Sequence, residues 1–134
     1  MIDRLAVDTN AVVDYFRANR PTPPALLEAR EVVLPLVVLG ELYAGAYASE
    51  RVSENLGAIE RLAAMWPLLS PDAESARIYG EIRAQEQRLI GNATIDPARK
   101  NDLWIAALCL QHNVPLLTND KAFDRVEGLV VVHW

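Results

Sequence analysis

The sequence predicts an α/β fold, with a parallel five-stranded sheet flanked by helices. Short apolar segments alternate along the chain with segments whose apolar residues recur at helical spacing. Several of the short segments are continuously apolar, as expected of strands that are buried on both faces of a parallel sheet. The chain has 134 residues, 51% of them hydrophobic, which is enough for one sizeable core. We therefore expect a single domain spanning residues 1–134, with right-handed crossovers between its strands.

Five apolar segments are expected as strands. Four of them are bounded by Pro, Gly, Asn or Asp, which favour turns, and the first begins almost at the chain end. In chain order they are Leu5–Val7, Val32–Leu34, Trp66–Leu69, Pro115–Thr118 and Leu129–His133.

Helices are expected between these strands, because apolar residues recur there three and four positions apart. In chain order the apolar stripes are Leu39-Leu42-Tyr43-Ala46, Leu56-Ile59-Leu62-Ala63, Ala76-Tyr79-Ile82 and, the clearest, Leu103-Ala106-Ala107-Leu110. Pro21, Pro23 and Pro24 mark a turn or a helix start. The segment Ile90–Lys100 has no clear periodicity, and we expect a mobile loop there that ends at a helix N-terminus.

Composition narrows the class of protein. The net charge of -5 argues against a passive nucleic-acid binder, although bound cations can invert the field at the site of an acidic enzyme. The lone Cys109 excludes an internal disulfide and a thiolate zinc cluster. No apolar segment approaches the roughly 20 residues of a membrane span, and Asp3, Arg4 and Asp8 interrupt any signal peptide. We expect a cytoplasmic protein without membrane contact.

Two acidic residues follow the first two predicted strands. Asp8 ends the first strand, where ligands bind in open α/β sheets, but it could equally be the N-cap of the next helix. Glu41 comes early in the helix after the second strand, among apolar and small neighbours. Taken alone, a favourable interaction with the helix dipole explains Glu41 better than a functional role does.

Two further acidic residues, Asp102 and Asp120, lie in the C-terminal half of the chain. The helix that carries Asp102 could be capped by Asn101, or it could begin earlier with Asp96 as cap and Pro97 in its first position. In the second case Asp102 is interior to a helix, where Asp has poor propensity and needs another reason. Asp120 follows the fourth strand, although Asn-Asp pairs also favour turns.

The four acids together suggest a metal site. The carboxyl ends of parallel strands lie at one edge of a sheet, so these carboxylates could converge there. They would repel one another unless cations neutralised them, and all-oxygen ligands suit Mg²⁺ or Mn²⁺. Such a site activates water for attack on a phosphodiester.

The chain resembles the PIN-domain nucleases and, within them, the VapC-type toxins of toxin–antitoxin pairs. The resemblance spans nearly the whole chain and rests on four short motifs in the right order, each weak alone. They are Val7-Asp8-Thr9-Asn10, Glu41-Leu42-Tyr43-Ala44-Gly45, Asn101-Asp102-Leu103-Trp104-Ile105-Ala106-Ala107 and Leu117-Thr118-Asn119-Asp120-Lys121-Ala122-Phe123. The ending Val126 to Trp134, with a terminal strand, also looks like the family.

The resemblance implies a metal-dependent ribonuclease that cleaves RNA with Mg²⁺ or Mn²⁺, is usually a homodimer, and is inhibited by a cognate antitoxin. By the same resemblance the metal ligands and catalytic residues are Asp8, Glu41, Asp102 and Asp120. Asn10 and Thr118 match positions that commonly support such an acidic cluster. The segment Ile90–Lys100 departs from the family, which often has a shorter basic-glycine turn there. It leaves Asp96 as a possible extra acid, although Asp102 is favoured because it opens the apolar motif.

Other residues allow two interpretations. Asp124, four positions after Asp120, could approach the same cavity as a supporting acid, but a solvated turn acid is the commoner case. The cations Arg83, Arg88, Arg99 and Lys100 could contact phosphates, while each alone is better explained as a surface charge. The main alternative to a nuclease is a catalytically inactive PIN-fold module that binds RNA or protein. A phosphatase that uses the same metal chemistry is a third possibility.

Overall fold

The fold is described from a computed structural model, which covers residues 2–17 and 20–134. Within them the sheet has five strands in the order β3-β2-β1-β4-β5, and every neighbouring pair is parallel. This confirms the predicted parallel α/β architecture. The strands are β1 (Arg4–Val7), β2 (Glu31–Pro35), β3 (Leu68–Leu69), β4 (Leu116–Leu117) and β5 (Val131–Val132).

The central strand β1 is the most buried part of the sheet. Leu5, Ala6 and Val7 are fully buried, so the continuous apolar pattern was correctly assigned to a strand covered on both faces. The last three strands are shorter than expected, yet their ladder extends beyond the named bounds. The amide of Ala6 donates to the carbonyl of Pro115, and the amide of Thr118 donates to that of Val132.

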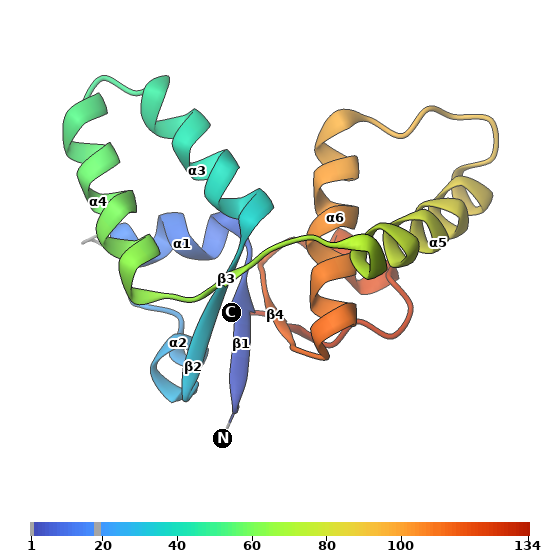
Figure 1. Ribbon diagram of the computed structural model, residues 1–134, viewed down its shortest axis with the longest axis horizontal. Helices are drawn as coiled ribbons and strands as arrows, with labels where there is room; N and C mark the ends of the chain where they lie inside the picture. The colour runs from blue at the N-terminus through green and yellow to red at the C-terminus, as the bar shows by residue number, and fades with distance from the viewer. Residues whose placement is uncertain (1, 18–19) are drawn as a thin grey trace.

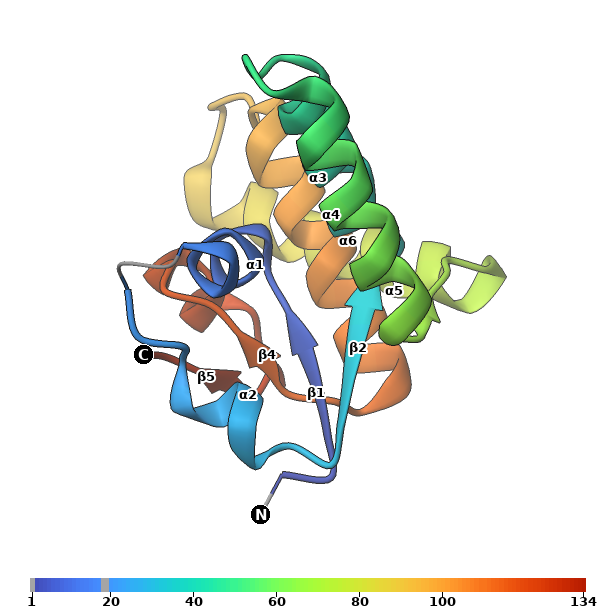
Figure 2. The ribbon, with the colours of Figure 1, turned by 90° about the vertical axis from the view of Figure 1, so that its left-hand side faces the viewer.

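Helices flank the sheet, and in Figure 1 the pair α3–α4 lies to the left and the pair α5–α6 to the right. Seen from the side in Figure 2, α1 lies across the carboxyl end of β1. The helices of the described residues are α1 (Thr9–Phe16), α2 (Pro24–Glu28), α3 (Leu36–Tyr47), α4 (Val52–Met65), α5 (Ala73–Ile90), α6 (Pro97–His112) and the short 3₁₀ helix η1 (Lys121–Arg125). None of them combines the length and apolarity needed to cross a bilayer, as far as the described chain extends.

The segment Ile90–Lys100 is less irregular than expected. Helix α5 continues through Ile90 and ends at Gly91, whose positive φ of 67° suits glycine. Helix α6 begins at Pro97, because the Asp96 carboxylate accepts from the amide of Arg99 at 2.9 Å and caps the helix. The loop is therefore confined to residues 91–96.

The starts of helices α3 and α6 decide between the alternative explanations of Glu41 and Asp102. Helix α3 begins directly after Pro35, five residues before Glu41, so Glu41 does not lie in the first helical turn. Its dipole explanation is therefore wrong. Helix α6 begins at Pro97 and not after Asn101, so Asp102 lies inside the helix and has no capping role. The proline-rich segment also contains a helix start, since Pro24 opens α2.

Candidate metal-binding and catalytic site

Asp8 sits at the carboxyl end of β1 and is only 6% exposed. Its Oδ1 accepts a hydrogen bond of 2.8 Å from the amide of Thr9, so Asp8 is indeed the N-cap of α1. Its Oδ2 accepts from the hydroxyl of Thr118, also at 2.8 Å. Burial raises the pKa of Asp8. The hydrogen bonds from Thr118 and Thr9 lower it by less, and the negative charge of Asp120 raises it slightly. Capping and a role in a site are therefore compatible in this residue.

Thr118 connects Asp8 to a second acid. It is fully buried at the end of β4, where its hydroxyl also accepts from the amide of Asp120 at 3.0 Å. Asp120 in turn caps η1 through a 2.9 Å bond from the amide of Ala122. One buried hydroxyl thus fixes the relative position of two strand ends and their carboxylates.

Glu41 reaches the same region from α3. Its Oε1 is buried and has no hydrogen-bond partner, which is costly for a carboxylate. Burial raises the pKa of Glu41, and the negative charge of Asp8 raises it further. The Thr9 side chain acts in the opposite direction and lowers this pKa. The buried Oε1, which has no donor of its own, is available to ligate a cation.

Asp102 has the most perturbed carboxyl group of the four. Its pKa is raised to about 7, mainly by burial and then by the charges of Asp8 and Asp120, with Glu41 adding a smaller effect. The positive charge of Arg99 opposes this shift but does not cancel it. The mutual influence of the four acids indicates that the fold brings them to one place.

These acids line an open cleft of about 460 Å³ at the carboxyl edge of the sheet. The cleft walls contain all four carboxylates, together with Asn10 and three side chains that the sequence did not single out, Asp14, Arg17 and Arg20. Asp14 is buried and is held by the indole of Trp134 and by Arg20, at 3.1 and 3.5 Å.

The donor set fits a hard divalent cation. It consists of carboxylate oxygens, one of them buried without a donor, and it contains no sulfur or imidazole. For the part of the chain that is described, no three acidic, His or Cys side chains are already arranged to hold one ion.

Two of the predicted supporting residues are placed differently. Asn10 lines the cleft, and its Oδ1 is buried without a partner. Asp124 is absent from the lining of this cleft. Its carboxylate lies 3.0 Å from Nε2 of His133, whose Nδ1 donates to the carbonyl of Thr118 at 2.6 Å. Among the described residues, Asp124 is linked to the site indirectly, by way of His133 and the carbonyl of Thr118.

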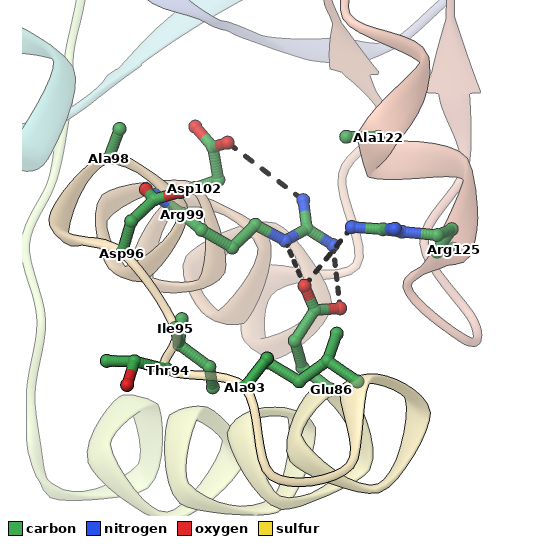
Figure 3. Close-up of a pocket in the computed structure, with 11 residues that line it drawn as sticks. Glu86, Ala93, Thr94, Ile95, Asp96, Ala98, Arg99, Asp102, Ala122 and Arg125 are labelled. Carbon is green, nitrogen blue, oxygen red and sulfur yellow. Dashed lines mark hydrogen bonds and ion pairs between the residues drawn. The ribbon is translucent and has the colours of Figure 1, made fainter.

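A second hollow lies on the other side of Asp102, with a buried ion pair in its wall (Figure 3). Arg99, expected as a phosphate contact or surface charge, is 8% exposed and binds Glu86, which is 5% exposed. The pair was missed, although its signal is in the sequence. Glu86 lies four residues after Ile82, and Arg99 four before Leu103, so both continue apolar helix stripes.

Comparison with known proteins gives a consistent result. Residues 5–129 match the family model described as PIN domain. Ribonuclease VapC1 of Haemophilus influenzae strain R2866 is 32% identical over 137 residues, covering 96% of each chain. Ribonuclease VapC5 of Mycobacterium tuberculosis is 30% identical over 121 residues, covering 86% of this chain and 82% of its own.

The fold is also similar to solved structures. VapBC-1 from nontypeable Haemophilus influenzae matches with a TM-score of 0.78 and 29% identity, covering 98% of both chains. DNA-bound VapBC from Salmonella typhimurium matches with a TM-score of 0.80 and 25% identity, covering 100% and 99%.

Proposed function

The chain belongs to the PIN-domain family, and we propose that it is an endoribonuclease that acts as the toxin of a toxin–antitoxin pair. Relatives named ribonuclease VapC align with it over nearly their whole length. The structures that share its fold include VapBC toxin–antitoxin complexes. All four acids expected from the family motifs are present and line one cleft.

One observation supports the metal-dependent chemistry most directly. Four carboxylates from separate segments of the chain surround this cleft, and their charges contribute to raising the pKa of Asp102 to about 7. Nearby like charges are unfavourable unless a cation compensates them. We propose Mg²⁺ or Mn²⁺ as that cation, bound by Asp8, Glu41, Asp102 and Asp120. When bound, it would supply a water activated for attack on a phosphodiester.

The chain's own residues would position the reacting groups. Thr118 holds Asp8 and the amide of Asp120 in register, so two carboxylates keep a fixed spacing. Arg17 and Arg20 line the same cleft and could contact the phosphates of an RNA strand entering it. Arg20 also bonds Asp14, which limits its reach.

Assembly and location are part of the same proposal. We propose that residues 1–134 form one domain that binds a cognate antitoxin and pairs as a homodimer in the cytoplasm. The support for both assemblies is the likeness to VapBC toxin–antitoxin complexes, with 29% identity and a TM-score of 0.78 to VapBC-1 from nontypeable Haemophilus influenzae. Light scattering of the chain with and without its antitoxin tests both assemblies.

A catalytically inactive PIN-fold module is the alternative. The presence of all four acids, and of the Thr118 hydroxyl that holds one of them, argues against it. The deciding experiment incubates the purified protein with a generic RNA pool in Mg²⁺, in Mn²⁺ and in chelator. Metal-dependent cleavage supports the proposal; binding without cleavage supports the alternative. Turnover of small phosphate esters with intact RNA would favour a phosphatase.

A further inference from the structure

The buried pair of Glu86 and Arg99 lies beside the proposed catalytic cleft but takes no direct part in it. Arg99 Nε donates to Glu86 Oε2 at 2.6 Å, and Nη2 donates to Oε1 at 3.1 Å. This two-point contact fixes the plane of the guanidinium (Figure 3). Arg125 is the last residue of η1, the helix that Asp120 caps, and it donates a third hydrogen bond to Glu86 at 3.2 Å.

The remaining edge of the guanidinium faces Asp102. Arg99 Nη1 is buried and has no hydrogen-bond acceptor, and it lies 3.9 Å from Asp102 Oδ2. This separation is close enough for electrostatic attraction but too long for a hydrogen bond. An unsatisfied donor would be expected to move the short distance to the carboxylate, unless something holds it back.

We propose that Glu86 is a positioning residue that restrains Arg99 and so leaves the Asp102 carboxylate free to bind the catalytic cation. Without the charge of Glu86, Asp102 is the one carboxylate of the described residues that remains within ion-pair range of the Arg99 guanidinium. Arg99 then closes on Asp102 and competes with the divalent cation for the same oxygens. This inference rests on the proposed metal site.

The test measures Mn²⁺ binding directly, without RNA, in titrations at pH 8.0. The wild type binds Mn²⁺. Glu86→Gln keeps the shape of the side chain but removes its charge. It should weaken Mn²⁺ binding about tenfold, the lower end of the effect expected for a residue that orients the surroundings of a metal ligand. Arg99→Gln should instead tighten binding, because it removes a positive charge that lies 3.9 Å from Asp102 Oδ2 and repels the cation. A Glu74→Gln variant, on the same helix in an exposed ion pair with Arg77, should bind as the wild type does.

The double variant separates this restraint from the general loss of a negative charge. That general loss acts equally in both backgrounds, whereas collapse onto Asp102 requires Arg99. Glu86→Gln should therefore cost about tenfold in affinity when Arg99 is present and about twofold or less in the Arg99→Gln background, a non-additivity that marks the two residues as coupled. A merely structural role would lower melting temperatures without this dependence on Arg99.

The outcomes are distinguishable. Equal Mn²⁺ affinity in wild type and Glu86→Gln overturns the inference and leaves the proposed function standing. Absence of Mn²⁺ binding in the wild type overturns both. Should Glu86→Gln fail to fold, Glu86→Asp decides: it keeps the charge but is one carbon too short for the two-point contact with Arg99, so weaker binding than in the wild type supports the inference and unchanged binding overturns it.

Discussion

Thr118 Oγ1 donates a 2.8 Å hydrogen bond to Asp8 Oδ2 and so joins two residues that are 110 positions apart. The same hydroxyl accepts from the amide of Asp120. The bond ties the carboxyl ends of β1 and β4, the two strands that carry these acids. The spacing of the proposed metal ligands therefore depends on a neutral side chain with no chemistry of its own.

Thr118→Val should lower the free energy of unfolding by about 1–3 kcal/mol, because it leaves a buried carboxylate oxygen and an amide without partners. It also removes an interaction that lowers the pKa of Asp8, so the acid limb of the cleavage profile should move to higher pH. Urea denaturation and a pH–rate profile measure these effects. The exposed Thr94→Val should change stability by less than about 0.5 kcal/mol. An unshifted profile in a less stable Thr118→Val protein would show that this residue acts on the fold alone.

Asp8→Asn should reduce Mg²⁺-dependent RNA cleavage by about 100-fold or more, since an amide keeps the shape but loses the charge that holds the cation. The fold should remain, as judged by circular dichroism, because Asn can also cap α1. Asp3→Asn, which alters an exposed ion pair, should cleave at the wild-type rate. Full activity in a folded Asp8→Asn protein would falsify the assignment of the site.

Asp102→Asn should stabilise the metal-free protein at pH 8. The folded-state pKa of about 7 lies above the ordinary aspartate pKa of 3.8. This group therefore contributes stability that is fully present below pH 3.8 and is lost as pH rises through about 7. One pKa unit corresponds to about 1.4 kcal/mol. Because solvent in the open cleft screens part of the interaction, we expect a gain on the order of 2 kcal/mol for Asp102→Asn.

Bound metal should make the charged Asp102 carboxylate stabilising, whereas in the metal-free protein that charge is destabilising. Millimolar Mg²⁺ should raise the melting temperature of the wild type by mass action, and it should raise the melting temperature of Asp102→Asn by less. Thermal melts with Mg²⁺ and with chelator measure both shifts. The exposed Glu60→Gln variant should respond as the wild type does. If Mg²⁺ shifts neither protein and Asp102→Asn melts lower than the wild type in chelator, these acids do not form a shared cation site.

His133 should titrate above its ordinary pKa of 6.5. Its Nε2 contacts the Asp124 carboxylate and its Nδ1 contacts the Thr118 carbonyl, and both partners are acceptors, so the protonated ring is favoured. The stability from this contact is fully present below about pH 6.5 and is lost as pH rises through the raised pKa. An NMR titration of the ring measures that pKa. Asp124→Asn should lower it, whereas Glu127→Gln should not; equal values in all three proteins would contradict the contact.

Local patterns in the sequence were sufficient for the architecture. The apolar run Leu5–Val7 and the stripe through Leu103 and Ala107 report burial directly, because strand and helix periods differ. The same patterns located Asp8 and Asp120 at strand ends, and the parallel sheet brings such ends to one edge. Element bounds were less well determined, since Asn101 and Asp96 were both possible caps of the helix that carries Asp102, and only the structure shows that Asp96 caps it.

Tertiary structure alone decided the environment of each acid. The burial of Asp102, the missing partner of Glu41 Oε1 and the bond from Thr118 to Asp8 arise from segments far apart in the chain. The same is true of the contact between Glu86 on α5 and Arg99 on α6. Periodicity shows that a charged residue lies on a buried helix face, but not which opposite charge faces it. Desolvation and Coulomb forces depend on distances in space, and those distances exist only once the helices have packed on the sheet.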